Sequence, residues 1–340
     1  MAKRSRAVKT TIVDIAEACG VSIATVSRII NNKPDVAEET RQRVLQLMDE
    51  WGFAPQINWQ QLRSGKSLFI ALHFPQDFNP PSQGIITAAA LGCEEADYTL
   101  NLIVKSLSDN DLLAIFRSGQ TDGMILMEIL LHDRRVELLK EQNLPFVMIG
   151  RCVDNTGLSY VDIDIEKGVA DAMQHLHDLG HRQIGFVTMA HALEGKEYGY
   201  ATWALEGYKK ASQKHGLPAH WLVADLDSAT GQVLTLLTEN PTLTAIVTPQ
   251  QSGVLAVLKA IQARGLRIPH DISVVGLLSE PMSELATPPL TTISFPAYEM
   301  GREAARILIG HLEGTQTAPQ QVLLRPELNV RGSTGPVRST

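Results

Sequence analysis

The stretch from Thr11 to Asn32, TIVDIAEACGVSIATVSRIINN, constrains the fold of this chain more than any other. The apolar residues of its first half recur at i, i+3, i+4 and i+7, the spacing of one helix face: Ile12, Ile15, Ala16 and Cys19. Gly20 predicts the end of that helix, because glycine tolerates a left-handed C′ position. Ser22 can cap a second helix by accepting a hydrogen bond from its free backbone N–H groups. The stretch therefore predicts two short helices joined by a tight turn.

The second helix has two different faces. Val26, Ile29 and Ile30 point one way, and the opposite face is small, hydroxylic and basic. A helix that enters the major groove needs such a face, with an Arg that can reach a guanine edge or a phosphate. We expect base contacts from Ile23, Ala24 and Arg28. We expect phosphate contacts from Thr11, Ser22, Thr25, Ser27 and Asn31. The alternative is a helical hairpin that merely packs in a small core.

The surrounding sequence favours the DNA-binding interpretation. A basic arm precedes the two helices: Lys3, Arg4, Arg6 and Lys9. A third helix is predicted after them from the apolar spacing of Val44, Leu47, Met48 and Trp51. These elements together predict an all-α helix-turn-helix headpiece over residues 1–54.

Four short motifs carry a resemblance to a known family. They are Asp14-Ile15-Ala16, Gly20-Val21-Ser22, Thr25-Val26-Ser27-Arg28 and Glu39-Thr40-Arg41. In sequence and spacing they resemble the headpiece of the LacI/GalR family of bacterial transcriptional regulators, and the resemblance continues through almost the whole chain. It implies a repressor that binds double-stranded operator DNA as a homodimer or higher oligomer. It also implies control by a small-molecule effector, most simply a carbohydrate.

Residues 55–66 form a polar linker with one prominent leucine, Leu62. We interpret it as a hinge that becomes helical on DNA, because so short a helix is marginal in water. In the family this hinge helix lies in the minor groove and its leucine wedges into a base step. Leu62 matches that position, although it could instead pack on the headpiece or core. Trp59 departs from the small residue usual there.

From residue 67 onward, short apolar runs alternate with amphipathic stretches, which predicts βαβ units and parallel sheets. Strands are predicted at 67–74, 100–104, 123–127, 145–149, 160–163, 183–188, 245–247, 273–277, 291–295 and 321–324. Helices are predicted at 82–97, 109–118, 133–142, 166–179, 200–215, 229–239, 253–264 and 297–312. We expect an α/β core over residues 67–340. Lobe one would span about 67–160 and 291–325, and lobe two about 161–290 and 326–340. The resemblance implies the fold of periplasmic sugar-binding proteins.

Two such lobes enclose a cleft, and parallel sheets bind ligands beyond the carboxyl ends of their strands. The candidate effector-binding residues follow predicted strands: Ser82, Gln83, Glu128, Arg151, Tyr200, Gln250, Ser252 and Ser279. Arg151 is the strongest candidate, because Ile149-Gly150-Arg151 resembles family members that respond to glucosides. A solvated loop or an interlobe pair is the alternative for each of these residues.

The cleft also departs from the family pattern. Ala204 stands where an Arg is usual, Gln250-Gln251 where Asn-Asp is usual, and Gly276-Leu277-Leu278 where Gly-(Tyr/Phe)-Asp is usual. These changes predict a pocket for a less hydroxylated ligand, or one that responds to no ligand.

Charge and cysteine content agree with a DNA-binding head on an acidic body. The chain carries a net charge of −7, with +2 on residues 1–65 and −9 on the rest, so only the head is expected to meet polyanions. Cys19, Cys93 and Cys152 form neither a disulfide framework nor a CxxC pattern. The N-terminal residues lack the apolar core of a signal peptide, so we expect a cytoplasmic protein.

Other functions find little support in the sequence. No Gly-rich phosphate loop is present, and we expect neither a cofactor nor an enzyme. His177 and His181 are four apart, but Gly180 is expected to end the helix between them, so a metal site is not favoured. Asp162 and Asp164 could be paired catalytic carboxylates, but a helix cap or a pair with Arg is favoured. The alternatives are a transporter-type solute-binding protein or an α/β enzyme on the same core.

Overall fold

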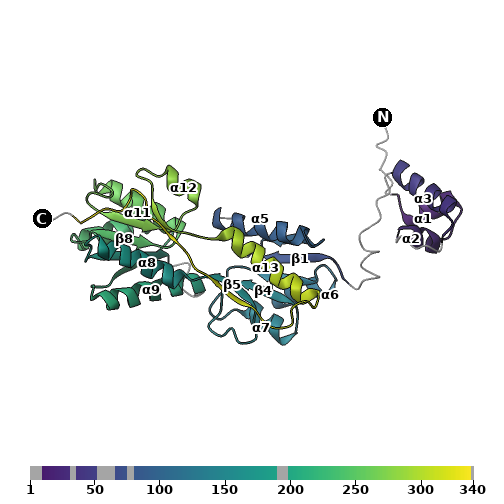
Figure 1. The fold of residues 1–340 in the computed structure, drawn as a ribbon, viewed down its shortest axis with the longest axis horizontal. Coiled ribbons are helices and arrows are strands. Elements are labelled where there is room, and N and C mark those ends of the chain that lie inside the picture. Colours follow the sequence, from purple (N-terminus) through teal and green to yellow (C-terminus); the bar gives the residue numbers. More distant parts are fainter. Residues whose placement is uncertain (1–9, 31–35, 52–65, 75–79, 190–197, 338–340) are drawn as a thin grey trace. The chain divides into compact units, whose positions relative to one another are not determined.

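The computed structural model describes residues 10–30, 36–51, 66–74, 80–189 and 198–337 (Figure 1). The chain divides into two compact units, Met1–Leu68 and Phe69–Thr340. The predicted linker, including Leu62, lies outside the described residues apart from residue 66, and so does Asn31. None of the helices in these ranges is both long and apolar enough to cross a membrane.

The first unit contains the predicted helices α1 (Ile12–Cys19), α2 (Ile23–Ile30) and α3 (Glu38–Glu50). Gly20 ends α1 with a left-handed φ of 65°, as predicted. The apolar faces of the three helices meet in one core, built around Ile15, Ala16, Cys19, Val26, Ile29, Val44 and Met48. Trp51 departs from the prediction that it continues the face of α3, because it follows the helix and is 45% exposed.

In the second unit, the first lobe is a six-stranded parallel sheet of order β11-β5-β4-β3-β1-β2. Its strands are β1 (Phe69–His73), β2 (Thr99–Ile103), β3 (Gly123–Leu126), β4 (Phe146–Ile149), β5 (Tyr160–Ile163) and β11 (Gln321–Leu324). Its helices are α5 (Pro80–Glu94), α6 (Asp109–Arg117), α7 (Arg134–Glu141) and α13 (Ala297–Leu312). Helix α13 packs against α5 and against β3, β4 and β5.

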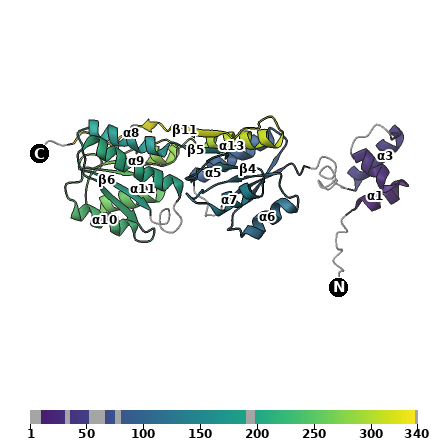
Figure 2. The ribbon, with the colours of Figure 1, turned by 90° about the horizontal axis from the view of Figure 1, so that it is seen from below.

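The second lobe is built on a sheet of order β12-β10-β9-β8-β6-β7, in which only the β10–β12 pair is antiparallel. Its strands are β6 (Ile184–Met189), β7 (His220–Ala224), β8 (Ala245–Thr248), β9 (Ser273–Gly276), β10 (Thr291–Ile293) and β12 (Leu328–Asn329). Its helices are α8 (Ile165–Asp178), α9 (Gly199–His215), α10 (Ala229–Glu239), α11 (Gln251–Ala263) and α12 (Glu280–Leu285). Figure 2 shows α8 and α9 on one side of this sheet and α10 on the other.

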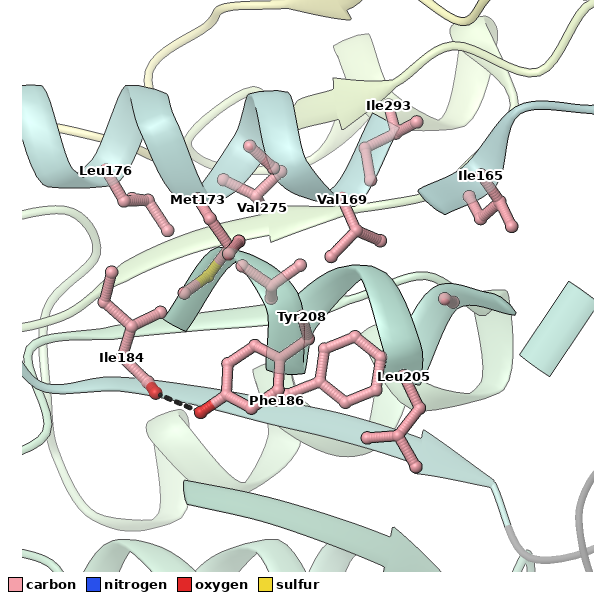
Figure 3. Packing of buried hydrophobic residues seen from close by; sticks show 14 of the residues in the cluster. Ile165, Val169, Met173, Leu176, Ile184, Phe186, Leu205, Tyr208, Val275 and Ile293 are labelled. Carbon is pink, nitrogen blue, oxygen red and sulfur yellow. Dashed lines mark hydrogen bonds between the residues drawn. The ribbon is translucent and has the colours of Figure 1, made fainter. Parts of the chain in front are cut away.

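The core between this sheet and helices α8 and α9 is shown in Figure 3. The ring of Tyr208 stacks on Phe186, with ring centroids 5.0 Å apart. The Tyr208 hydroxyl donates a hydrogen bond to the Ile184 carbonyl at 2.9 Å and accepts one from the His220 amide at 2.7 Å. A single buried side chain of α9 therefore joins β6 to the start of β7.

The sheets correct two of the predicted lobe assignments. The segment 291–295 was assigned to lobe one, but β10 is hydrogen-bonded to β9 and β12 in the second sheet. The predicted boundary at residue 160 is also wrong, because β5 pairs with β4 and β11 in the first sheet. A short apolar run predicts a strand but carries no information on which sheet receives it. The chain therefore enters the second lobe after β5, returns after β10 and crosses again after β11.

Candidate functional site

The outward face of α2 carries the side chains that were predicted to meet DNA bases. Ile23 is 43% exposed, and Ala24 and Arg28 are exposed too. Val26 and Ile29, on the opposite side of the helix, are buried in the headpiece core. The core thus fixes which face of α2 is presented to solvent.

The hydroxyl residues of the headpiece fix the beginnings of its helices. The Thr11 hydroxyl and backbone amide both donate hydrogen bonds to the Asp14 carboxylate, at 2.6 and 2.7 Å, and these bonds lower the pKa of Asp14. Ser22 accepts a hydrogen bond from the Thr25 amide at 3.1 Å, which confirms the predicted cap of α2. Ser27 lies partly buried on the same helix. Direct phosphate contacts by these residues stay a prediction.

A cavity of about 440 Å³ lies between the two lobes of the core. Six of the predicted effector-binding residues line it: Ser82, Glu128, Arg151, Tyr200, Gln250 and Ser252. Gln83 and Ser279 do not. Gln83 is one residue beyond Ser82 on α5, a turn of about 100° on the helix, and its side chain is exposed. Ser279 precedes α12, where its carbonyl accepts the hydrogen bond of Ser283.

Arg151 is tied to both lobes. Its Nε lies 3.1 Å from the buried carboxylate of Asp162, and its guanidinium carbon lies 4.9 Å above the Trp203 ring of α9. Burial raises the pKa of Asp162 to about 6, and the positive charge of Arg151 opposes that rise. Asp164 accepts a hydrogen bond from the Lys167 amide and caps α8. The favoured interpretation of the two carboxylates, a pair with Arg and a helix cap, is therefore confirmed.

Gln250 uses its carbonyl oxygen to hold the second lobe together. Gln250 Oε1 accepts hydrogen bonds from the Thr188 hydroxyl at 2.9 Å and from the Met189 amide at 2.7 Å. Its amide nitrogen lies 3.4 Å from the Tyr200 hydroxyl and donates to it. Burial raises the pKa of Tyr200 above its ordinary value, so its hydroxyl stays neutral. Gln250 thus positions Tyr200 at the cavity wall.

Glu128 follows β3 in a left-handed backbone conformation, with φ 53°. The guanidinium of Arg135 holds this turn by donating to the Met127 and Glu128 carbonyls at 3.1 and 2.8 Å. Arg135 is itself paired with buried Asp133 at 2.6 Å. Burial raises the pKa of Glu128 to about 7, partly opposed by the charge of Arg135. Arg135 was missed by the sequence analysis, because nothing in the local pattern of α7 marks a residue that binds a distant backbone.

The rest of the cavity wall is largely apolar. Its apolar side chains come from both lobes: Ile85, Met127, Ile129, Ile149, Ile163, Ile165, Leu255, Leu277, Phe295 and Met300. Leu277 was noted in the sequence as a departure from the family pattern, whereas Ala204 is buried in the core of the second lobe. The wall agrees with the predicted loss of hydroxyl-binding positions.

His181 has partners for both ring nitrogens. Its Nδ1 lies 2.9 Å from the Thr244 hydroxyl and its Nε2 lies 3.0 Å from the Gly335 carbonyl. Burial lowers the pKa of His181, which favours the neutral ring, and the ring joins the residue before β8 to the C-terminal segment.

A helix-turn-helix unit followed by a two-lobed α/β core with a central cavity defines the class of ligand-responsive DNA-binding regulators. Residues 11–56 match the family described as "Bacterial regulatory proteins, lacI family", and residues 173–334 match a "Periplasmic binding protein-like domain". The chain is 30% identical to catabolite control protein A of Priestia megaterium over 338 residues, which cover 95% of this chain and 99% of that protein. The chain therefore belongs to the lacI family and is a transcriptional regulator, not an enzyme.

Two solved structures illustrate the similarity. A complex of the transcriptional regulator CelR with cellobiose has a TM-score of 0.71 and 27% identity, and covers 95% of this chain and 99% of that chain. A lac repressor dimer bound to operator and the anti-inducer ONPF has a TM-score of 0.83 at 24% identity, over 96% of this chain and 100% of that chain. This second likeness confirms the predicted fold class.

Proposed function

We propose that this regulator is a repressor that reads its operator with the outward face of α2. The observation that supports this most directly is the exposure of Ile23, Ala24 and Arg28 on a helix whose other face is locked into a core. Arg28 can form a bidentate pair with guanine, Ile23 can make apolar contact with a thymine methyl group, and the small Ala24 allows the helix to approach the groove closely. Thr11, Ser22, Thr25, Ser27 and Asn31 would position the helix on phosphates.

We assign the interlobe cavity to a small-molecule effector, as the cellobiose complex of CelR suggests. Its volume of about 440 Å³ is within the range of ordinary ligand sites. A ligand there touches Glu128 and Arg151 from the first lobe and Tyr200 from the second. Such a ligand favours one arrangement of the lobes over others and can thereby change operator affinity.

We propose that the working unit is at least a homodimer, as the dimeric lac repressor suggests. Two-fold symmetry would match a palindromic operator. Large exposed apolar side chains occur on both lobes: Leu91 on α5, Leu255 on α11, Leu285 on α12 and Tyr298 on α13. Helix α6 carries none of the large exposed apolar side chains found among the described residues. Leu255 also lines the cavity, so we centre the proposed interface on α5, α12 and α13.

We propose the domain plan predicted from the sequence, with the headpiece at 1–54, the linker at 55–66 and the core from 67 onward. Within the linker, Leu62 would wedge into the minor groove of the operator and bend it. Its position lies outside the described residues, so this role rests on the family resemblance. We place the protein in the cytoplasm, where its operator would be.

In vitro selection of DNA from random and genomic fragments with the full-length protein tests the proposed function. We expect a palindromic site and binding that weakens as salt rises, because phosphate contacts release counterions. Replacing Arg28 with Ala should relax base preference within each half-site. Lys214→Ala is the matched control, because it removes an exposed positive charge at the end of α9 in the core. Recovery of no preferred sequence would refute the proposed function.

A further inference from the structure

The cavity has an uneven balance of charge. Besides Tyr200, it is lined by two acidic groups, the carboxyls of Glu128 and Asp162, and by one basic group, the guanidinium of Arg151. Arg151 is paired with Asp162 at 3.1 Å. Within the described part of the chain, no hydrogen bond or ion pair is made by the side chain of Glu128. A ligand therefore meets one carboxyl group that has no ion-pair partner of its own, although the charge of Arg135 acts on it.

A second polar atom at this wall also lacks a partner and is also an acceptor. Gln251 lines the cavity, and its side-chain carbonyl oxygen is buried without a hydrogen bond among the described residues. The neighbouring Gln250 oxygen is already occupied by Thr188 and Met189. Buried polar atoms are normally paired, so the Gln251 oxygen calls for a donor from the ligand, and the Glu128 carboxylate, when ionised, accepts donors as well. An ammonium group has three donors and no acceptor, whereas a hydroxyl brings acceptor lone pairs as well.

The surrounding structure fixes the backbone conformation of Glu128. A left-handed backbone at a residue other than glycine is strained, and it persists where its surroundings enforce it. Arg135 enforces it here through two hydrogen bonds to the carbonyls of Met127 and Glu128. Tyr200 and Phe295 line the same cavity and offer aromatic faces, to which a cation is attracted.

We propose that the effector of this regulator carries a protonated amine that pairs with Glu128, on an apolar or weakly polar body that fills the rest of the cavity. The inference rests on the proposed function and names the ligand class of that site. A phosphate or carboxylate at the same position is disfavoured, because the ionised Glu128 would repel it. Gln251 would accept a second hydrogen bond from the same ligand.

The proposal implies a dependence on pH. The charged and titratable groups around Glu128 are Arg135 from α7, Tyr200 from α9, and the Arg151–Asp162 pair from the ends of β4 and β5. With a pKa of about 7, Glu128 is mostly neutral at pH 6 and mostly ionised at pH 8. Affinity for an amine that stays protonated should therefore rise about tenfold over this interval. An ordinary glutamate would be fully ionised throughout.

Calorimetric titration of the full-length protein with matched small molecules tests the proposal. The probes are cyclohexylmethyl, benzyl and 2-phenylethyl compounds, each with a hydroxyl, a primary amine or a carboxylate at its end. We expect one amine to bind at least ten times more tightly than its hydroxyl counterpart at pH 8, and its carboxylate counterpart to bind more weakly still. Glu128→Gln should abolish the difference between amine and hydroxyl. Glu137→Gln, an exposed change of the same kind on α7, should leave it intact.

Several results would overturn the proposal. They are a hydroxyl or carboxylate probe that binds as tightly as its amine counterpart, a Glu128→Gln protein that keeps the preference, and a panel in which no probe binds. Titrations of the unaltered protein between pH 6 and pH 8 test the pairing with Glu128 without a substitution. An amine affinity that does not change over this interval would contradict the pairing. Operator selection needs no effector, so a failure of the proposed function is seen separately from a failure of this inference.

Discussion

Replacing Glu128 with Gln should stabilise the ligand-free core at alkaline pH and do much less at acidic pH. Burial raises the pKa of Glu128 from an ordinary 4.5 to about 7. The folded protein therefore binds this proton more tightly than the unfolded chain. Ionising Glu128 in the folded protein therefore lowers the free energy of unfolding. This loss is absent below pH 4.5, grows between pH 4.5 and 7, and is complete above pH 7. At 1.36 kcal/mol per pKa unit, it amounts to about 3 kcal/mol.

Glutamine has nearly the same shape and carries no charge, so the variant avoids this loss. We expect the free energy of unfolding to rise by roughly 2–3 kcal/mol at pH 8 and by less than about 1 kcal/mol at pH 5. For a core of this length, the gain at pH 8 corresponds to a Tm higher by about 4 °C. Urea and thermal unfolding of both proteins at the two pH values measure the difference. An equal change at both pH values, or a loss of stability at pH 8, would refute the argument, and Glu137→Gln supplies the baseline for an exposed carboxylate.

Three further substitutions have defined outcomes. Arg28→Ala should weaken binding to the selected operator by about 1–3 kcal/mol in fluorescence anisotropy, and unchanged affinity would remove Arg28 from the base contacts. Tyr208→Phe leaves the partly buried His220 amide without its acceptor and should lower the free energy of unfolding by about 1–3 kcal/mol; urea unfolding that is unaffected would contradict this. Arg151→Ala leaves Asp162 buried without its cation, so the pKa of Asp162 should rise above 6. The loss of stability should then be larger at pH 8, about 3–5 kcal/mol, than at pH 5, and a loss independent of pH would show that Asp162 does not depend on Arg151.

Much of the core could be predicted because its elements carry local signals. The helices Ala229–Glu239 and Ala297–Leu312 have the predicted bounds, since an apolar face repeats along each. The elements that escaped prediction lack such signals. The edge strand β7 is only partly buried, α12 is six residues long and begins at Glu280-Pro281, and β12 has two residues. Strand β7 shows no regular alternation of buried and exposed residues, and α12 and β12 are too short to establish a period.

The sheet membership of β10 escaped for a different reason. Its three residues are all buried, a pattern that either sheet would satisfy. What places β10 is its ladder to β9 and the pairing of Thr292 with Asn329. These are contacts between distant parts of the chain, and no single-sequence pattern encodes them.

The residues of the cavity also fall into those that a local sequence pattern predicts and those that depend on tertiary contacts. The rule that ligands bind beyond strand ends found Glu128 and Arg151, because a strand end can be read from a short apolar run. The same rule could not separate Ser82 from Gln83, which depends on how α5 is rotated about its axis. It also could not find Arg135, whose function lies in hydrogen bonds to the carbonyls of residues 127 and 128.

The place of Glu128 in the chain links ligand binding to the contact between the lobes. The next residues, Ile129 and Leu130, meet the second lobe: the Gly199 amide donates to the Ile129 carbonyl at 3.2 Å, and Leu130 forms a β-bridge with Tyr198. A Cβ on Gly199 would lie 2.8 Å from the Arg151 carbonyl, so only glycine allows this approach. A ligand that fixes the Glu128 side chain also fixes the backbone on which the lobes meet. The free energy of ligand binding is therefore coupled to the contact between the lobes. If the ligand changes operator affinity by some factor, operator DNA must change ligand affinity by the same factor.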